Sequence, residues 1–250
     1  YWLRPVTALL FLAATAGFLT SLRGAPRQTA SFATWAVCAF YAAMAAVFGG
    51  GAALAIAGRF APAETIDLAF PLSGGLYVVG QGGSSVAVNY HNAYRTQTYA
   101  LDILKLNAFG FRAAGLAPRD PARYAIFGDL VTSPCDGTVV FMRDGLEAAR
   151  GAQRDADAPA GNTVVLDCDG ATVLLAHFMK DSIVVAEGEA VGVGAPLGRV
   201  GNSGNTSEPH LHIHAEQGPY AGERFDNPGL AIRFNGRFLA RGDLIRGDSD

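Results

Sequence analysis

Two long stretches without a charged side chain, residues 5–22 and 31–58, constrain most strongly what this 250-residue chain can fold into. An α-helix needs about 20 apolar residues to cross the hydrocarbon core of a bilayer. A cleaved signal peptide usually has a shorter apolar run, and a helical hairpin inside a soluble protein normally carries a polar face. The sequence therefore predicts two transmembrane helices, which form a hairpin over residues 1–60.

The arginines beside these stretches predict how the hairpin is oriented. Arg23 and Arg27 lie between the two helices, whereas Arg4 and Arg59 flank the hairpin on the other side. Short cytoplasmic loops are enriched in Lys and Arg. We therefore expect the loop in the cytoplasm and the chain after residue 60 on the outer side of the membrane. The lipid bilayer is the expected partner of residues 1–60.

The chain after residue 64 has the pattern of a β-sheet domain, because short runs rich in Val, Ile and Thr alternate with turn residues. The six clearest runs are residues 74–80, 137–145, 162–170, 171–178, 182–201 and 210–216. Runs at this spacing predict a mainly β fold, an antiparallel sandwich or barrel. Asp169 and Gly170 form a dipeptide typical of a tight hairpin. We expect residues 61–86 to form a linker and the first strand.

Charge and cysteine content exclude several classes of protein. The formal net charge is −3, and a nucleic-acid-binding protein usually shows a basic patch instead. The three cysteines form no C-x-x-C pair, which argues against thiolate metal sites and thioredoxin-like chemistry. Cys135 and Cys168 fall in neighbouring strand-like runs of a domain expected outside the cytoplasm, where disulfides are permitted. Whether the two cysteines pair depends on geometry that the sequence does not give.

The five histidines of the chain all fall in the β region: His91, His177, His210, His212 and His214. The last three alternate after a glycine-rich turn, so on a strand they share one face, with neighbours about 6.6 Å apart. Imidazoles at this spacing can converge on one zinc ion, which in catalytic sites keeps three protein ligands and one open position. The alternative is a sheet face whose histidines are only hydrogen-bonded.

Several motifs, in a fixed order, resemble the lysostaphin-type zinc metallopeptidases, which cleave peptide cross-links in bacterial cell walls. The resemblance covers about residues 87–235. Its motifs are QTYALDI (97–103), FGDLVTSPCDGTVV (127–140), GNTVVLD (161–167), LLAHF (174–178), the run from VAEGEAVGVG to PHLHIH (185–214) and NPGLAIRFNG (227–236). The resemblance implies a duplicated hybrid motif fold over residues 87–250, zinc as cofactor, a water on the zinc as nucleophile and peptidoglycan peptides as substrate. It also implies that the hairpin lies in the bacterial cytoplasmic membrane, with the domain facing the periplasm or the cell exterior.

The resemblance assigns roles to four residues. The second His of the H-x-H motif, His212, and the Asp of the Y-A-x-D strand, Asp102, correspond to zinc ligands. The first His of H-x-H, His210, and the His of the A-H motif, His177, flank the attacking water. One of these two is expected to act as general base while the other stabilises the oxyanion or protonates the leaving amine. His214 lies one step beyond the motif, and we expect it at the rim of the same face.

The third ligand departs from the usual pattern of the family. Most members place a His four residues before the Asp, where this chain has Thr98, but a subgroup carries a longer spacing. His91 precedes Asp102 by eleven residues, and two antiparallel strands joined by a turn would bring them within about 5 Å. We therefore predict that His91, Asp102 and His212 bind zinc. The alternative is an inactive scaffold of the same fold that binds cell wall or activates a partner hydrolase.

Two loop regions carry further expectations. Residues 107–127 show no regular period, and we expect an irregular insertion that covers the cleft. The glycines of the turn at 201–209 are expected to supply positive φ angles or a close approach of two backbones. The oligomeric state is not predicted. A further alternative is a biotin- or lipoyl-type carrier or a sugar-phosphotransferase module; a carrier needs a lysine at a hairpin tip, and neither Lys105 nor Lys180 lies in such a turn, which argues against it.

Overall fold

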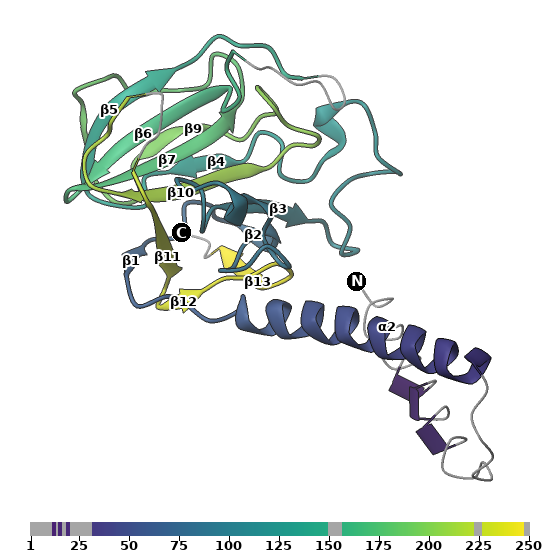
Figure 1. The fold of residues 1–250 in the computed structure, drawn as a ribbon. Helices are drawn as coiled ribbons and strands as arrows, with labels where there is room; N and C mark the ends of the chain where they lie inside the picture. Colours follow the sequence, from purple (N-terminus) through teal and green to yellow (C-terminus); the bar gives the residue numbers. More distant parts are fainter. Residues whose placement is uncertain are drawn as a thin grey trace. The chain divides into compact units, whose positions relative to one another are not determined.

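The structure is a computed structural model that describes residues 12–13, 15–16, 19–20, 32–149, 157–222 and 227–247. The chain divides into two compact units, residues 1–50 and residues 51–250 (Figure 1). The second unit holds all the strands that are described.

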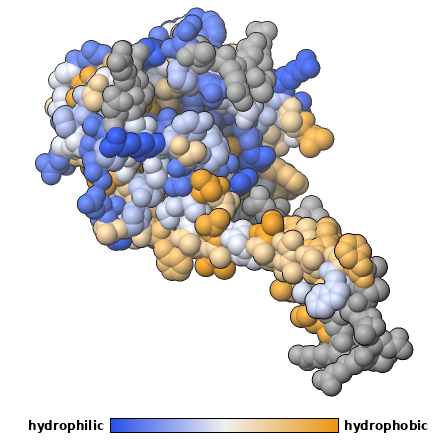
Figure 2. All heavy atoms as spheres, viewed as in Figure 1, coloured by the Kyte–Doolittle hydropathy of each residue, from blue (hydrophilic) through white to orange (hydrophobic). Residues whose placement is uncertain are grey.

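One described helix is long and apolar enough to cross a membrane. It is α2 (Phe32–Ala57), in which the residues Trp35–Ala57 form a candidate span with none of its most apolar part packed inside the protein. Figure 2 shows apolar side chains along this helix. The first predicted span lies mostly outside the described residues, and only its positions 12–13, 15–16 and 19–20 are seen to be helical. The two-helix hairpin is therefore not confirmed.

The last turn of α2 meets the start of the β domain. The Ser85 hydroxyl donates a hydrogen bond of 2.7 Å to the Leu54 carbonyl, and the Ser84 amide donates one of 2.8 Å to the Gly58 carbonyl. The Leu54 carbonyl also accepts a hydrogen bond of 2.9 Å from the Gly58 amide, so the bonds from residues 84–85 add attachments at the end of the helix.

One large sheet of mainly antiparallel strands dominates residues 51–250 (Figure 1). In order across the sheet, its main strands are β13 (Leu244–Gly247), β2 (Gly75–Gln81), β3 (Leu101–Leu106), β10 (Leu211–Gln217), β7 (Ala171–Phe178), β6 (Asn162–Cys168), β5 (Gly137–Arg143) and β8 (Ala190–Val191). A side branch leaves β10 through β11 (Gly229–Phe234), which also pairs with β1 (Thr65–Leu68) and β12 (Arg237–Phe238). Only the β1–β11 pair is parallel among the described strand pairs. The mainly β, antiparallel fold is thus confirmed.

A two-stranded sheet, β4 (Leu130–Thr132) with β9 (Pro196–Arg199), packs on one face of the large sheet. Val131 of β4 and Leu197 of β9 are fully buried in the same apolar core as Leu175 of β7 and Ile213 of β10. The hydrophobic core therefore lies between the two sheets. The opposite face of β7 and β10 remains available for a site.

Strand β10 separates these two environments residue by residue, because successive side chains of a strand point to opposite faces. Leu211, Ile213 and Ala215 belong to the core, and each is at most 1% exposed. The residues between them, beginning with His212, lie on the other face. The alternation of apolar and polar residues in this strand thus directs the histidines away from the core.

Several local expectations can now be compared with the structure. Asp169 and Gly170 have φ angles of +54° and +82° between the paired strands β6 and β7, as a tight hairpin turn requires. The run 182–201 is not one strand but contains two short ones, β8 and β9, because glycines and a proline interrupt it. Residues 61–86 contain β1 and β2, and β2 is an interior strand of the large sheet.

Residues 107–127 are irregular, as predicted. Their described structure consists of turns, a short 3-10 helix η2 (Pro121–Arg123) and one isolated bridge between Ala113 and Tyr124.

The cysteines resolve an open question. Cys135, which precedes β5, forms a disulfide with Cys168 at the end of β6. Cys38 in α2 is a free thiol.

Candidate metal centre

Strand β10 lies between β3 and β7, and its register places two predicted ligands directly opposite each other. His212 pairs with Asp102 of β3 on one side and with Ala176 of β7 on the other. Side chains of directly opposite residues start about 5 Å apart. As a result, the Nδ1 atom of His212 lies 2.9 Å from the Oδ1 atom of Asp102. Ala176 is small, which leaves room beside the imidazole.

His91 reaches the same place from outside the sheet. It lies on a one-turn 3-10 helix, η1 (Tyr90–Ala93), and not on the adjacent strand that the spacing suggested. Its Nε2 atom is nevertheless 3.0 Å from Asp102 Oδ1 and 3.1 Å from Asp102 Oδ2. The proximity of His91 and Asp102 was therefore predicted correctly, whereas the element that carries His91 was not.

A buried asparagine holds the His91 turn against the sheet. Asn89 has no exposed surface, and its Oδ1 atom accepts a hydrogen bond of 3.2 Å from the His91 amide. Its Nδ2 atom donates to the carbonyls of Gly83 and Ala100, each at 3.1 Å. Since Ala100 immediately precedes β3, this one side chain ties the turn to the strand that carries Asp102.

His91, Asp102 and His212 together form a cluster with the geometry of a metal site. Each offers one ligand atom, the three atoms lie within 4.8 Å of one another, and all three residues are buried. Thr98, at the position where most lysostaphin-type enzymes have a ligand, has another role. Its hydroxyl donates to the backbone carbonyls of Arg95 and Tyr94, at 2.8 and 3.1 Å.

His177 is placed by a bulge at the end of β7. Asn162 pairs with Phe178 while Thr163 pairs with Ala176, so His177 is the extra residue. Its φ angle is +67°, in a region that residues other than glycine seldom adopt. Bulges and strained residues of this kind are often found beside active sites, where they direct a side chain.

The hydrogen bonds of His177 and His210 fix which ring nitrogen faces the cluster. His177 Nδ1 lies 2.8 Å from the Ser203 carbonyl, and His210 Nδ1 lies 2.8 Å from the Glu208 carbonyl. A carbonyl only accepts, so each Nδ1 donates, and in a neutral ring the lone pair is then on Nε2. His210 Nε2 is 3.6 Å from Asp102 Oδ1. The ring centroids of His177 and His210 are 4.7 Å apart.

The turn at 201–209 depends on its glycines, as predicted. A Cβ atom at Gly201 would lie 2.4 Å from the Met179 amide nitrogen. At Gly204 the φ angle is +81°, and a Cβ would lie 2.4 Å from the Gly161 nitrogen. The close approach of these backbones therefore requires glycine, which fixes the turn that leads into the H-x-H strand.

His214 corrects one expectation and reveals two residues that sequence reasoning missed. It is only 1% exposed, so it does not lie at a rim. Its Nδ1 atom lies 2.9 Å from His212 Nε2, and its Nε2 atom lies 3.2 Å from Glu216 Oε1. On the other side of the cluster, His91 Nδ1 is 3.0 Å from Gln97 Oε1. The alternation H-I-H-A-E was a usable signal for Glu216, whereas nothing in the sequence singled out Gln97.

Burial and neighbouring charge keep His212 and Asp102 in the protonation state that metal binding requires. Burial lowers the pKa of His212 and of His214 to about 3, so both rings are neutral at pH 7. Burial, reinforced by His210 and His212, also holds the pKa of His177 well below its ordinary value. Burial alone would raise the pKa of Asp102, but His210 and hydrogen bonds to His212 and His91 outweigh it and lower that pKa. Metal ligands must be deprotonated, and these groups are.

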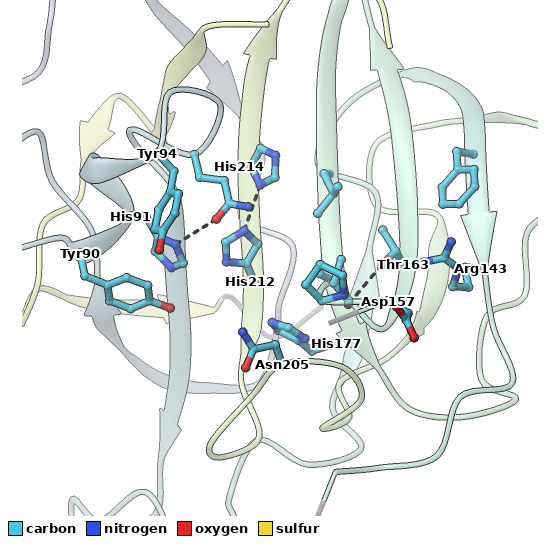
Figure 3. Close-up of a pocket in the computed structure, with 16 residues that line it drawn as sticks. Tyr90, His91, Tyr94, Arg143, Asp157, Thr163, His177, Asn205, His212 and His214 are labelled. Carbon is cyan, nitrogen blue, oxygen red and sulfur yellow. Dashed lines mark hydrogen bonds between the residues drawn. The ribbon is translucent and has the colours of Figure 1, made fainter. Parts of the chain in front are cut away.

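The cluster lies beside a cavity of about 510 Å³ (Figure 3). Aromatic side chains from separate segments, Tyr90, Tyr94 and Phe141, line it together with the imidazoles of His91, His177 and His212. The Tyr90 ring stacks on His91 with centroids 4.0 Å apart. Apolar walls with a few convergent polar groups are typical of ligand sites.

Residues 107–127 do not cover this cavity, contrary to expectation. Within the described ranges, no residue of that segment lines it. Instead, Arg112 forms an ion pair with Glu208, in the turn before His210. The insertion therefore contacts the turn before the H-x-H strand and not this cavity.

Comparison with known proteins is consistent with this geometry. Residues 123–226 match the model of Peptidase family M23. That range contains His177, His210 and His212, whereas His91 and Asp102 precede it. Fold, cluster and match together define a peptidase-type domain. The match assigns a Peptidase family M23 domain to residues 123–226.

The solved structures that match this chain have low sequence identity and low TM-scores. A putative M23 peptidase from Pseudomonas aeruginosa is 21% identical over 68% of this chain and 53% of its own, with a TM-score of 0.34. A putative glycyl-glycine endopeptidase from Ruminococcus gnavus is 18% identical over 65% and 56%, with a TM-score of 0.39. The catalytic domain of lysostaphin from Staphylococcus simulans is 17% identical over 45% and 81%, with a TM-score of 0.30. This chain spans about half the length of the first two, and 38% of lysostaphin in its solution structure.

Proposed function

We propose that this protein is a membrane-anchored zinc metalloendopeptidase that hydrolyses peptide cross-links of bacterial peptidoglycan. The observation that carries the proposal is the convergence of His91, Asp102 and His212, with His177 and His210 beside them. These residues come from three strands or strand ends and one turn, up to 121 positions apart in the sequence. Structural needs alone do not explain such a concentration of buried polar side chains on one face of a sheet.

The ligand atoms of the cluster suit zinc. Zinc binds His nitrogen and Asp oxygen at about 2.0–2.2 Å in a tetrahedron, which puts neighbouring ligand atoms about 3.3 Å apart. The contacts of Asp102 Oδ1 with His212 Nδ1 and His91 Nε2, at 2.9 and 3.0 Å, are a few tenths of an ångström shorter. His91, Asp102 and His212 would hold the ion, and three protein ligands leave one position for water.

A zinc ion in this position supplies a Lewis acid and lowers the pKa of water bound to it. The protein supplies the proton transfers. The Nε2 atoms of His177 and His210 carry lone pairs in the neutral rings, so either can accept a proton from the attacking water. The other, once protonated, would donate a hydrogen bond to the oxyanion or a proton to the leaving amine. The carbonyls of Ser203 and Glu208 keep both rings in the required tautomer.

The substrate class follows from the family and is compatible with the cavity. The M23 match supports peptide-bond hydrolysis, and cell-wall peptides are the substrates that the resemblance implies. The cavity has a volume of about 510 Å³, and residues 107–127 do not line it, so they need not move for a peptide to bind there. Tyr90, Tyr94 and Phe141 would contact the apolar parts of that peptide.

The proposed location rests on α2 and the disulfide. The candidate span Trp35–Ala57 would anchor the chain in the bacterial cytoplasmic membrane, and the positive-inside rule puts residues after 60 on the outer side. Disulfides persist in the periplasm and at cell surfaces but are rare in the cytoplasm. The Cys135–Cys168 bond supports the same orientation independently of the arginine distribution.

Zinc content and cell-wall digestion test the proposal together. We expect the purified full-length chain to bind one zinc ion and to release soluble muropeptides from isolated peptidoglycan. Removal of the metal with a chelator should abolish release, and addition of zinc should restore it. His212→Ala should fail in both assays while remaining folded. A wild-type protein that cannot be loaded with zinc would instead indicate the inactive scaffold.

A further inference from the structure

Three buried residues on one face of β10 form a hydrogen-bonded chain that runs away from the metal centre. His212, His214 and Glu216 are 5%, 1% and 1% exposed. His212 Nε2 is 2.9 Å from His214 Nδ1, and His214 Nε2 is 3.2 Å from Glu216 Oε1. Figure 3 shows His214 next to His212 on the same strand. We refer to these three residues as the β10 relay.

A metal ion on His212 would set the order of donors in the β10 relay. When His212 Nδ1 offers its lone pair to a metal ion, the proton of the neutral ring lies on Nε2. His214 Nδ1 must then accept that proton's hydrogen bond, so His214 carries its own proton on Nε2. The Glu216 side chain then accepts from His214 Nε2. Every hydrogen bond therefore points away from the metal and towards Glu216.

A count of protons leads to the same arrangement. Asp102, His212, His214 and Glu216 make three successive contacts, but two neutral rings carry only two N–H groups. In the metal-free protein His212 Nδ1 donates one of these protons to Asp102. With a cation between Asp102 and His212, both protons would instead be used in the contacts of His214 with His212 and Glu216. In the opposite arrangement His212 would carry its proton on Nδ1, where it blocks the ligand atom.

We propose that His214 and Glu216 are positioning residues of the zinc centre, which act through His212 by fixing the tautomer that exposes Nδ1 to the metal. This inference rests on the proposed function, since it assigns a purpose to residues outside the ligand set. Partners beyond the ligands orient metal-binding histidines and raise their basicity. His91 has a neutral partner of this kind in Gln97, whereas the chain behind His212 ends in a carboxylate.

The variant Glu216→Gln tests the charge with little change of shape. An amide can rotate and donate to His214, so it permits the wrong tautomer as well as the right one. We expect roughly 10- to 100-fold weaker zinc binding, measured by competition with a chromophoric chelator on the full-length chain in detergent. The matched control is Glu64→Gln. Its exposed carboxylate accepts from Gln217, the next residue of β10, and the substitution should change zinc affinity less than twofold.

A second measurement needs no substitution. The chain has only five histidines, so selective ¹⁵N labelling of histidine gives an NMR spectrum in which the tautomer of each ring is resolved. In the zinc-loaded protein we expect protons on Nε2 of both His212 and His214.

The variant His214→Phe removes the relay but keeps a ring. In the cobalt-loaded variant we expect the visible absorption bands to show more than one coordination geometry.

The outcomes separate the two proposals. Wild-type protein that binds zinc and hydrolyses peptidoglycan, with Glu216→Gln equal to Glu64→Gln in zinc affinity, would overturn the relay alone. A proton on Nδ1 of His214 in the zinc-loaded wild type would do the same, even if the variants fail to fold. Wild-type protein that binds no zinc would overturn the proposed function and the relay together.

Discussion

The proposed metal centre has two halves that are held in different ways. The strand half consists of Asp102, His210 and His212, on or next to paired strands of the large sheet, where β10 is hydrogen-bonded on both sides. The turn half is His91, on a single 3-10 turn whose attachment to the sheet depends largely on Asn89. The strand half is thus part of a cooperative framework, whereas the turn half is a local arm that can be disturbed alone.

The two halves meet different requirements of a metal site: the strands fix the distance between ligands, and the turn completes the ligand set. Rigid strands set the separation of His212 and Asp102 through backbone register, which side-chain substitutions hardly alter. The last ligand is added from a loop, so its position depends on a few side-chain hydrogen bonds. Loops tolerate changes of length and sequence better than strands do, which is why the His91 ligand can sit at an unusual distance along the chain.

The largest effect is expected from His91→Ala, because this variant loses the turn half and keeps only the strand half. One of three protein ligands is lost, and a third of a typical zinc-binding free energy is about 4 kcal/mol, or about a thousandfold in affinity. The strand half should remain folded, with an unchanged midpoint of urea unfolding for the metal-free protein. Zinc affinity equal to that of the wild type would show that the turn does not belong to the centre.

A smaller effect is expected from pH, which acts on the strand half. The pKa of His212 and of His214 is about 3 in the folded protein and about 6.5 in the unfolded chain, so the unfolded chain takes up protons first as pH falls. Stability of the metal-free protein is therefore fully present above pH 6.5 and decreases below it. Between pH 8 and 5.5 each ring should cost about 1.4 kcal/mol, about 3 kcal/mol for both.

Urea unfolding of the metal-free chain at the two pH values measures this loss. His214→Phe provides the control, because it removes one ring whose pKa is lowered and should reduce the pH dependence by about 1.4 kcal/mol. A pH dependence that is unchanged in this variant would mean that another group causes it.

The smallest effect is expected from Asn89→Ala. This variant loosens the turn that carries His91 without removing a ligand, and so tests how the turn half is held. Loss of the buried hydrogen bonds to His91, Gly83 and Ala100 should lower the free energy of unfolding by about 2 kcal/mol. Zinc affinity should fall by about tenfold, because His91 is no longer held in place. Asn92→Ala is the matched control in the same turn, since Asn92 makes a single side-chain bond of 3.3 Å to the Thr98 carbonyl. Equal effects of the two variants would contradict the role given to Asn89.

Local pattern was sufficient for the strand half. Alternation in H-L-H-I-H placed three histidines on one face, and the Y-A-x-D strand supplied Asp102. The Asp-Gly hairpin between β6 and β7 was equally readable, because the turn type is a property of two adjacent residues. The membrane hairpin was predicted from composition alone, and only its second helix, α2, is described well enough to support it.

Other features were decided by contacts between distant segments. His214 was expected at a rim but is enclosed by the packing of its neighbours on β7, of which Leu174 is directly opposite. The segment 107–127 was expected over the cavity but contacts Glu208 instead. Burial and the direction of a loop both depend on which segments fold beside them, and no short window of sequence contains that information.

By itself the sequence determined which residues can carry the chemistry, because side-chain type and strand periodicity are local properties. Only the tertiary structure decided that His91 reaches Asp102 from a 3-10 turn, that Cys135 pairs with Cys168, and that Glu216 lies behind His214. Each of these depends on distances between segments far apart in the chain. Such distances are set by the register of β3, β7 and β10 and by the packing of the core, in which many weak contacts act together.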